Sequence, residues 1–430
     1  MTSAAADVKN TLPGALSIVL GLLVFSVFLN YVDRGNLSIA APMIKDELHL
    51  SAAQLGFLLS SFFWTYGLFQ IMAGWLVDKF NVNWVLAGGF FLWSAATGVT
   101  GILHGFEALF VVRLVLGIGE SVAYPAYSKI LAQYFPASHR SRANSWIMAG
   151  LSTGPAFGML AGGILMSRFG WRPFFVVLGV ASLLWLVPWV RWMPRGQGIA
   201  ISQETGWSPT TMEILAQRSA WGTFAALFCG NYILYLLITW LPFYLLRERH
   251  FSMDAMGEVG GAVFLTQAAA AVLCGRYCDR WLARGGTSTR VRKTFLTSGI
   301  IATGTLLWAS TFVGPVFCVL LLMLAGTGMG ISGCNMWPTT QTLAGPHASG
   351  RWTGLQCGVA NYSGVLAATL TGIIVGRTGH FAPAFAVAMG FGLLGAACWA
   401  FIVGPIEPVV WAPRKTIYPK DAVAETATSF

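Results

Sequence analysis

Charged residues are scarce in this chain. Asp, Glu, Lys and Arg make up 10% of its 430 residues, whereas an ordinary soluble domain has about 25%. A soluble protein of this length would need more polar residues to cover its surface. The hydrophobic residues, 56% of the chain, fall instead in runs of about 20, and a helix of that length crosses a hydrocarbon layer of ~30 Å. The composition excludes soluble, disordered, fibrous and disulfide-stapled classes, and it predicts an integral membrane protein.

The sequence also lacks the motifs of several chemistries. No Gly-Lys-Ser/Thr phosphate loop occurs, and the Gly-Ile-Gly at 117–119 lies in an apolar run without a preceding strand, so we expect no direct use of ATP. The seven cysteines show no metal or redox spacing, and Cys274 and Cys278 have no nearby His to complete a metal site. No nucleophile–base pair is visible. We therefore expect no enzyme activity, no cofactor and no metal.

Basic residues outnumber acidic ones, but their distribution argues against a nucleic-acid partner. The 26 Lys and Arg, against 16 Asp and Glu, are scattered through short loops rather than massed on one face. One set of alternate loops holds most of them, and the opposite set holds only Lys45, Arg168, Arg172, Arg247, Arg249 and Arg377. Because loops rich in Lys and Arg stay in the cytoplasm, we expect both termini and the central loop to be cytoplasmic.

Twelve apolar segments are expected to form the transmembrane helices of an all-α protein. They lie at 14–40, 53–77, 83–103, 107–134, 143–167, 172–193, 220–246, 257–282, 294–313, 315–343, 352–376 and 381–404. A polar stretch rich in Gly, Ser, Thr and Pro divides them six and six. The expected domains are a cytoplasmic N-terminal segment at 1–13, a six-helix bundle at 14–193, a cytoplasmic central loop at 194–219, a second six-helix bundle at 220–404 and a cytoplasmic tail at 405–430.

Short motifs recur about 200 residues apart. Gly-Trp-Leu-Val-Asp-Lys at 74–79 is matched by Gly-Arg-Tyr-Cys-Asp-Arg at 275–280, and Tyr-Pro at 124–125 is matched by Trp-Pro at 337–338. Such offsets suggest two pseudo-symmetric repeats that face each other across a central path, as in a rocking carrier. Motif or gating roles are expected for Gly74, Asp78, Lys79, Arg142, Asp279 and Arg280.

Four ionisable residues lie at membrane depth. They are Asp33 and Arg34 in the first segment, and Arg113 and Glu120 in the fourth. Each would cost at least ~2.5–3.5 kcal/mol near the bilayer centre, so pairing or a water-filled cavity is required. One interpretation is a pair of interhelical salt bridges. We favour a second, in which the arginines bind an anion and the carboxylates carry protons, because Arg stays charged whereas a carboxylate can be neutralised.

The second half offers neutral polar groups at comparable depth. The candidates are Asn231, Tyr232, Tyr235, Gln267, Asn335, Trp337, Thr339, Gln341, Gln356 and Asn361. Amides and an indole can hydrogen-bond hydroxyls and cover an apolar sugar face, although interhelical hydrogen bonding explains any single one as well. Among these we favour Trp337 and Asn361, with Asn335 as a further candidate. Tyr31 and Tyr66 can add hydroxyl groups near the arginines, with packing as the alternative role.

Three motifs, in order along the chain, resemble one transporter family. The segments Asn-Tyr-Val-Asp-Arg-Gly-Asn-Leu-Ser at 30–38, Arg-Leu-Val-Leu-Gly-Ile-Gly-Glu at 113–120 and Ile-Thr-Trp-Leu-Pro-Phe-Tyr at 238–244 are similar to those of the anion:cation symporter family. The segment at 74–80 resembles a loop signature of the major facilitator superfamily. The symporter family includes bacterial galactonate, glucarate and hexuronate carriers, and sialin and vesicular glutamate carriers are its animal relatives.

The resemblance implies a monomer with the twelve-helix major facilitator fold in the inner (cell) membrane. It further implies proton-driven uptake of a sugar acid, such as an aldonate, aldarate or hexuronate, by alternating access. Two alternatives remain open. One is a carrier of aromatic or short-chain carboxylates, and the other, from a different class, is a membrane sensor that binds such ligands without moving them.

Roles for individual residues follow from the same resemblance. It implies proton binding by Asp33 and Glu120, carboxylate binding by Arg34 and Arg113, and substrate contact by Tyr31 and Tyr66. The Asn-Met-Trp-Pro at 335–338 departs from the family pattern, which affects the substrate assignment more than the coupling.

Overall fold

The computed structural model describes residues 14–135, 137–194 and 209–411, and within these ranges it contains helices and no strands. The N-terminal half holds α2 (Gly14–Glu47), α3 (Ala52–Lys79), α4 (Val82–Thr100), α5 (Phe106–Ser121), α6 (Ala123–Tyr134), α7 (Ala137–Phe169), α8 (Trp171–Leu183) and α9 (Leu186–Trp192). The C-terminal half holds α10 (Thr211–Leu215), α11 (Arg218–Arg247), α12 (Met253–Ala283), α13 (Ser288–Ala309), η1 (Ser310–Phe312), α14 (Pro315–Asn361), α15 (Ser363–Thr378), α16 (Ala382–Ala397) and η2 (Cys398–Ile402).

The predicted all-helical membrane fold is confirmed, and each of the twelve expected segments falls on helix. Ten helices in the described ranges are long and apolar enough to cross a membrane. The remaining two segments correspond to α3 and to the pair α5 and α6, which a turn at Val122 separates. The tenth and eleventh segments share α14, and non-helical backbone angles at Gly345 (φ 65°, ψ 178°) separate them.

Several boundaries differ from the expectation; for example, α13 begins at Ser288 and not near residue 294. The first helix runs on to Glu47 instead of ending near residue 40, because Lys45, Asp46 and Glu47 are polar enough to continue it beyond the hydrocarbon. Helix α7 begins at Ala137 rather than 143. Within the expected central loop, α10 forms a short helix that a capping box between Thr210 and Glu213 begins. The domain limits stay a prediction, and residues 1–13, 195–208 and 412–430 lie outside the described residues.

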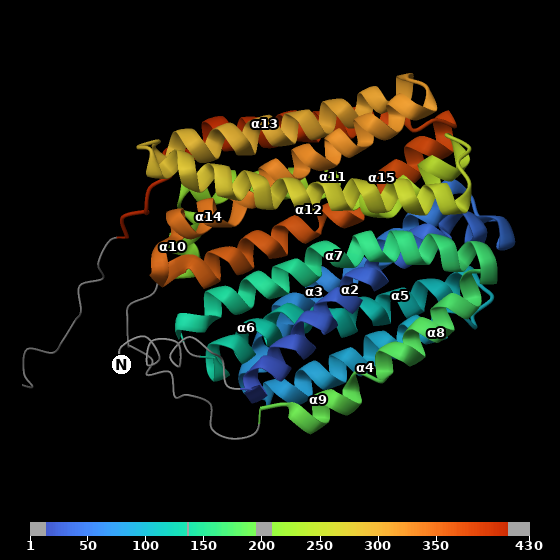
Figure 1. Cartoon of the computed structure of the whole chain (residues 1–430), viewed down its shortest axis with the longest axis horizontal. Helices are drawn as coiled ribbons and strands as arrows, with labels where there is room; N and C mark the ends of the chain where they lie inside the picture. Colours follow the sequence, from blue (N-terminus) through green and yellow to red (C-terminus); the bar gives the residue numbers. More distant parts are fainter. Residues whose placement is uncertain (1–13, 136, 195–208, 412–430) are drawn as a thin grey trace, which may run out of the picture.

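The two halves lie side by side, as Figure 1 shows with the N-terminal half in blue to green and the C-terminal half in yellow to red. Their contacts follow the repeat. Helix α7 packs along α12, α3 packs along α15, and α2 contacts α11. Helices α2 and α11 are the first long helices of their halves, and the other two pairs join helices from different positions in the two halves. These six helices form most of the contact between the two halves, and the central path between the repeats stays a prediction.

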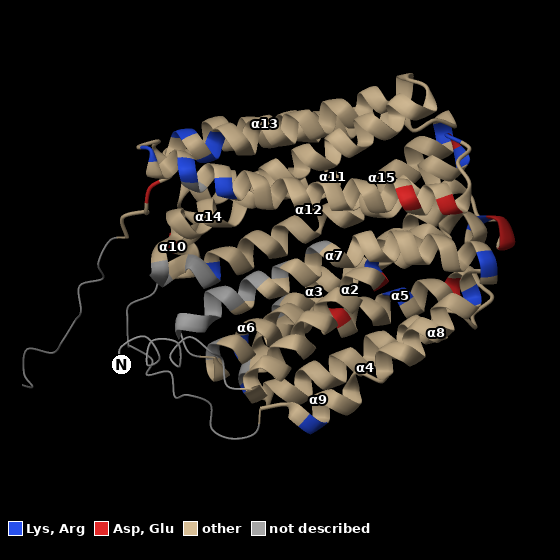
Figure 2. Ribbon diagram, in the orientation of Figure 1, with Lys and Arg blue, Asp and Glu red and all other residues tan. Residues whose placement is uncertain are grey.

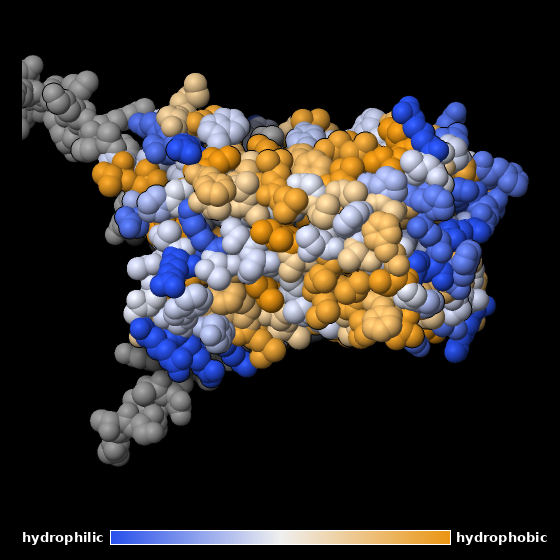
Figure 3. All heavy atoms as spheres, turned by 90° about the horizontal axis from the view of Figure 1, so that it is seen from above, coloured by the Kyte–Doolittle hydropathy of each residue, from blue (hydrophilic) through white to orange (hydrophobic). Residues whose placement is uncertain are grey.

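The outer surface is suited to lipid. Large apolar side chains are exposed along it, including Trp75, Phe91, Val187 and Phe317, with exposed fractions of 56%, 55%, 71% and 66%. In Figure 3 apolar residues form a broad band between two polar ends. Figure 2 shows most Lys, Arg, Asp and Glu at those two ends. The protein is a multi-pass membrane protein, and the exposed apolar belt marks the part within the bilayer.

The halves approach most closely where α2, α7, α11 and α15 terminate, a region defined here as the Glu47 end. A Cβ placed on Gly372 of α15 would lie 2.7 Å from the carbonyl oxygen of Ala52 and 3.0 Å from the Cα of Gly56. A Cβ on Gly163 of α7 would lie 2.9 Å from the Cα of Gly257 on α12. Because small residues let helix backbones touch, the halves close against each other at this end by backbone contact.

Polar side chains add contacts between the halves at the Glu47 end. Arg247 of α11 forms an ion pair with Asp46 of α2, and Ser167 Oγ donates to Asp254 Oδ1 at 2.6 Å. The side chains of the ion pair are 44% and 58% exposed, and such pairs contribute only about 0–1 kcal/mol. These contacts join the two halves at this end, but they contribute little to the free energy that holds the halves together.

The close approach at Gly372 gives a direct test of the fold. Gly372→Ala places a methyl group against Ala52 and Gly56, and overpacking of this kind costs about 1–3 kcal/mol. Gly376→Ala is the matched control, because its Cβ would meet the Ala52 Cβ at 3.6 Å, an ordinary contact. Both changes gain the same helix propensity. We expect the thermal unfolding midpoint of the purified protein to fall for Gly372→Ala relative to Gly376→Ala; equal midpoints would contradict the packing.

Candidate functional site

The four charged residues at membrane depth are all buried in the N-terminal half. The exposed fractions are 3% for Asp33, 7% for Arg34, 4% for Arg113 and 0% for Glu120. Helix α2 supplies the first two, and α5 supplies the others. Charges taken this far from water need specific partners, and the partners found distinguish a structural role from a functional one.

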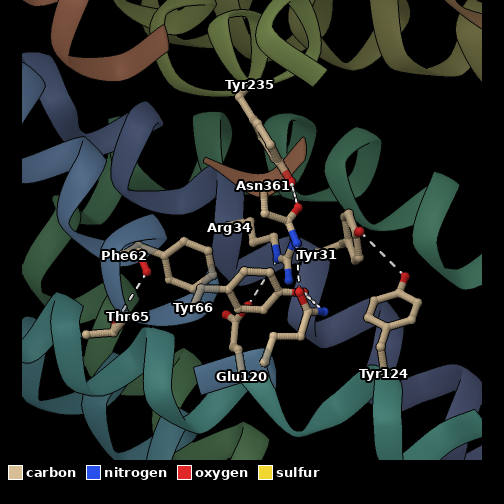
Figure 4. A network of polar contacts seen from close by, with 10 residues as sticks. Tyr31, Arg34, Phe62, Thr65, Tyr66, Glu120, Tyr124, Tyr235 and Asn361 are labelled. Atoms are coloured by element: carbon tan, nitrogen blue, oxygen red, sulfur yellow. Dashed lines mark hydrogen bonds and ion pairs between the residues drawn. The ribbon is translucent and has the colours of Figure 1, made fainter. Parts of the chain in front are cut away.

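Arg34 and Glu120 form an ion pair between α2 and α5. The Nε of Arg34 lies 3.0 Å from Oε2 of Glu120. The guanidinium carbon of Arg34 lies 4.6 Å from the ring centroid of Tyr31 and 4.4 Å from that of Tyr66, as Figure 4 shows. Aromatic faces stabilise a cation without using its N–H groups. The rings therefore hold the guanidinium in place while its remaining donors stay available, and one of the two expected interhelical salt bridges is present.

Asp33 and Arg113 are not paired in this way. Among the described residues, both carboxylate oxygens of Asp33, Nη2 of Arg34 and Nε of Arg113 have no hydrogen-bond partner. The guanidinium carbon of Arg113 lies 5.2 Å from the Phe62 ring centroid. Buried polar atoms without partners are unfavourable. A purely structural network would satisfy them, so these atoms are the ones free to bind a proton or an anion.

A small cavity lies between the halves beside both arginines. Arg34 and Arg113 line it from the N-terminal half, and Tyr235 and Thr239 line it from α11 of the C-terminal half. The remaining lining is Ser38, Leu59, Phe62, Phe63 and Ile238. The cavity measures only about 10 Å³, room for about one water molecule. A larger anion would therefore meet the two cations on one side and the hydroxyl groups on the other only after the halves part.

A chain of hydrogen bonds connects the two halves next to this cavity. Tyr235 OH donates to Asn361 Oδ1 at 2.8 Å, and Asn361 Nδ2 donates to Gln70 Oε1 at 2.7 Å. Gln70 Nε2 lies 3.4 Å from the hydroxyl oxygen of Tyr66, whose ring flanks Arg34. The structure thus brings Asn361 and Tyr66 together, as Figure 4 shows. Sequence analysis did not identify Gln70; its signal was an amide one helical turn after Tyr66 in an apolar segment.

Two other candidates of the second half lie apart from this network. Asn335 Nδ2 lies 3.1 Å from Cys278 Sγ and 3.2 Å from Cys334 Sγ, so its amide points toward cysteines rather than the arginines. Trp337 is half-buried on α14. The substrate contacts expected of both residues stay predictions. In the N-terminal half, Tyr31 joins the network, with its hydroxyl 3.5 Å from that of Tyr124.

Three cysteines form the group of described residues that could hold a metal. The sulfur atoms of Cys274, Cys278 and Cys334 lie within 4.8 Å of one another. From sequence spacing only the first two were expected to be close, because the third is supplied by α14. Asn335 donates to two of these sulfurs, which packs the group as a compact buried cluster. Cys278 belongs to the second copy of the repeated motif, and none of the three cysteines lines the cavity.

The motif residues lie toward the end of the bundle opposite the Glu47 end. Lys79 is exposed at the end of α3, where its Nζ lies 4.6 Å from the Trp75 ring centroid. Arg280 is exposed near the end of α12. The side chains of Asp78, Arg142 and Asp279 lie outside the described residues, and Gly74 lies on α3 with open space around it. The gating roles of this set stay predictions.

Comparison with known proteins identifies the class. The profile of the Major Facilitator Superfamily matches residues 23–368, so the chain belongs to this superfamily of membrane transporters and is not an enzyme. The "Hexuronate transporter" of Bacillus subtilis is 28% identical over 93% of this chain and 97% of its own length. The "Ascorbate transporter, chloroplastic" of Arabidopsis thaliana is 32% identical over 89% of this chain and 74% of its own. The "Probable galactarate/D-glucarate transporter GarP" of Escherichia coli K12 is 28% identical over 90% and 94%.

Solved structures show the same fold. A bacterial homologue of the human lysosomal transporter Spinster, in an inward-facing and unoccupied conformation, has a TM-score of 0.74 over 91% of this chain and 96% of its own, at 19% identity. The D-xylose-proton symporter has a TM-score of 0.74 over 91% and 99%, at 14% identity. The predicted major facilitator fold and the relationship to hexuronate and glucarate carriers are therefore confirmed.

The buried ion pair predicts a coupled stability effect. Arg34→Met leaves the Glu120 carboxylate buried without its partner, and breaking a buried pair costs about 3–5 kcal/mol. The double variant Arg34→Met/Glu120→Leu removes both charges and should recover most of that loss. We expect the lowered thermal midpoint of Arg34→Met to rise at acidic pH, because a protonated carboxyl needs no cation. Additive losses in the double variant, measured by thermal unfolding, would show that the two side chains do not act as a pair.

Proposed function

We propose that this chain is a secondary transporter that takes up an organic monoanion of the sugar-acid class together with protons. The observation that carries the proposal is the pair of buried arginines that line one cavity between the halves, one of which is bonded to the titratable carboxylate of Glu120. Relatives named for hexuronate and for galactarate or glucarate support the substrate class. On the distribution of Lys and Arg, we place the Glu47 end outside the cell membrane and both termini in the cytoplasm.

The arginines account for anion binding. Arg34 and Arg113 border the cavity and keep N–H groups without partners among the described residues. A guanidinium presents its N–H groups in a planar fork that matches a carboxylate. Because an arginine cannot lose its charge under physiological conditions, the cavity stays attractive to an anion throughout the transport cycle unless another carboxylate competes.

The carboxylates account for proton coupling. Glu120 is bonded to Arg34, so an ionised Glu120 competes with substrate for that guanidinium. Protonation removes the competition and frees Arg34 for the anion. Loss of the proton on the cytoplasmic side restores the pair and displaces the substrate. Asp33, whose oxygens have no hydrogen-bond partner among the described residues, is the second proton-binding group in this proposal.

The hydroxyl groups of a sugar acid would meet the opposite half. Tyr235 and Thr239 line the cavity, and the bond from Asn361 to Gln70 joins the halves next to it. Substrate hydroxyl groups can take the place of protein groups in this series of hydrogen bonds, because a hydroxyl both donates and accepts. Binding would then be completed only when both halves surround the substrate, which ties occupancy to the rocking movement.

Proton coupling has a sharp test at Glu120. Glu120→Gln keeps the size of the side chain but cannot exchange a proton. We expect this variant, in proteoliposomes, to lose uptake of a sugar acid driven by a pH gradient while it still exchanges substrate across the membrane in counterflow. Glu107→Gln is the control, because Glu107 lies on the same helix and is exposed at its start. Unchanged pH-driven uptake by Glu120→Gln would refute the role of this carboxylate.

The substrate class is tested with a panel of acids at two pH values. Gluconate, galactonate, glucarate, glucuronate, phthalate and lactate separate sugar acids from the aromatic and short-chain alternatives. We expect Asn361→Leu to raise the KM for glucuronate by about tenfold, since hydrogen bonds to hydroxyls are lost, and to leave any uptake of phthalate, which has no hydroxyl group, unchanged. Uptake of phthalate or lactate in preference to every sugar acid would favour the alternative carrier, and binding without uptake would favour a sensor.

A further inference from the structure

A second cavity opens at the Glu47 end between the two halves. It has a volume of about 740 Å³ and is bordered by α2, the start of α3, α11 and α15. Its lining includes Lys45, Asp46, Phe243, Arg247, Ile373 and Arg377. Ligand sites for small molecules commonly have volumes of roughly 300–1,000 Å³. This hollow is therefore large enough for an organic anion, and it combines charged groups with apolar walls.

The lining carries more positive than negative charge. Arg247 is bonded to Asp46, whereas Lys45 and Arg377 form no ion pair among the described residues. The neighbouring acids are engaged elsewhere. Glu47 pairs with Arg172 at 2.6 Å, and Glu248 accepts from the backbone N–H of Phe381 at 2.7 Å. The hollow therefore keeps an excess of two cations, which raises the local concentration of anions.

The helix dipoles explain only part of this arrangement of basic side chains. Lys45, Arg247 and Arg377 each lie in the last turn of a helix, where a basic side chain interacts favourably with the helix dipole. The dipole accounts for a cation at each helix end. It does not account for three such side chains lining one hollow. Arg168, which also lies in the last turn of its helix at this end, is not part of the lining.

The hollow lies on the same path as the cavity beside Arg34. Helix α2 lines the inner cavity through Arg34 and the outer hollow through Lys45, eleven residues and about 16 Å further along the helix. Helix α11 does the same through Thr239 and Arg247. Between the two spaces, the backbone contact of Gly56 with Gly372 closes the path. An anion arriving from the Glu47 end would reach the outer hollow first.

We propose that this hollow is an outer receiving site for the transported organic anion. The carboxylate of the anion binds between Lys45 and Arg377 and competes with Asp46 for Arg247. Since the Asp46–Arg247 pair joins α2 to α11 across the halves, its replacement by a ligand carboxylate weakens closure at this end. A ligand that binds better when the pair is broken shifts the equilibrium toward opening. The inference rests on the proposed anion transport and on the proposed outward orientation of the Glu47 end.

The test compares two arginine substitutions. Both arginines lie in the last turn of a helix, but only Arg377 lines the hollow. Uptake of radiolabelled D-glucuronate is measured in right-side-out membrane vesicles with an imposed pH gradient, at low and at high ionic strength. Arg377→Gln removes a lining cation, and Arg168→Gln removes an exposed cation outside the hollow at the same end of the molecule. We expect Arg377→Gln to raise the KM for external D-glucuronate about threefold at low ionic strength without lowering the maximal rate. Arg168→Gln should leave the KM unchanged.

The second part of the test removes a negative charge instead of a positive one. Asp46→Asn removes the acid that competes for Arg247, so it should lower the KM for external D-glucuronate. In inside-out vesicles the KM should match that of the unmodified protein for Arg377→Gln and Arg168→Gln, which leave the Asp46–Arg247 pair in place. A KM for Arg377→Gln equal to that of the unmodified protein, or a rise shared by Arg168→Gln, would overturn the receiving site while leaving the transport proposal intact. Absence of uptake of every acid in the panel by the unmodified protein would overturn both proposals.

Discussion

The buried ion pair between Arg34 and Glu120 is the interaction on which the rest of the site depends. Two charges removed from water lose several kcal/mol of hydration each, and a well-packed apolar pair would often be at least as stable. Stability alone therefore does not explain why this pair lies in the N-terminal half. What an apolar pair cannot supply is a difference between its members: the guanidinium keeps its charge, whereas the carboxyl can give its charge up. In the proposed mechanism, this difference lets protonation of Glu120 determine whether Arg34 is free to bind an anion.

The two halves contribute different chemistry to the same cavity. The N-terminal half supplies the cations Arg34 and Arg113, and the C-terminal half supplies neutral groups, Tyr235 and Thr239. Ionic attraction needs little directional fit, so the N-terminal half can hold an anion while the halves are apart. Hydrogen bonds require donor–acceptor distances near 3 Å, so the C-terminal half contributes only when the halves surround the ligand. Under the proposed function, selectivity for hydroxyl groups would depend on the closed arrangement.

The sequence was sufficient for the helices and for the charged residues, because both are marked by local composition. Apolar runs define the helices, and in a chain with so little charge the four buried ionisable residues stand out. Contacts that depend on which helix faces meet could not be obtained this way. Gln70 meets Asn361 only because α3 lies against the C-terminal half, and Cys334 joins two other cysteines only because α14 packs on α12. Asn335 was a substrate-binding candidate on its residue type alone; its amide points toward sulfur atoms, and its contact with substrate stays a prediction.

A carrier needs closures that hold but also part within each cycle, and the contacts at the Glu47 end have this character. The glycine contacts of α3 with α15 and of α7 with α12 bring backbones together with few interlocking side chains, so the helices can separate without repacking a core. The exposed Asp46–Arg247 pair adds little free energy. Two conformations that differ by only a few kcal/mol can be interconverted by a ligand with a modest preference for one of them. Under the proposed receiving site, an anion that replaces Asp46 on Arg247 would break an exposed contact of this closure, and a modest binding preference would then be enough to favour opening.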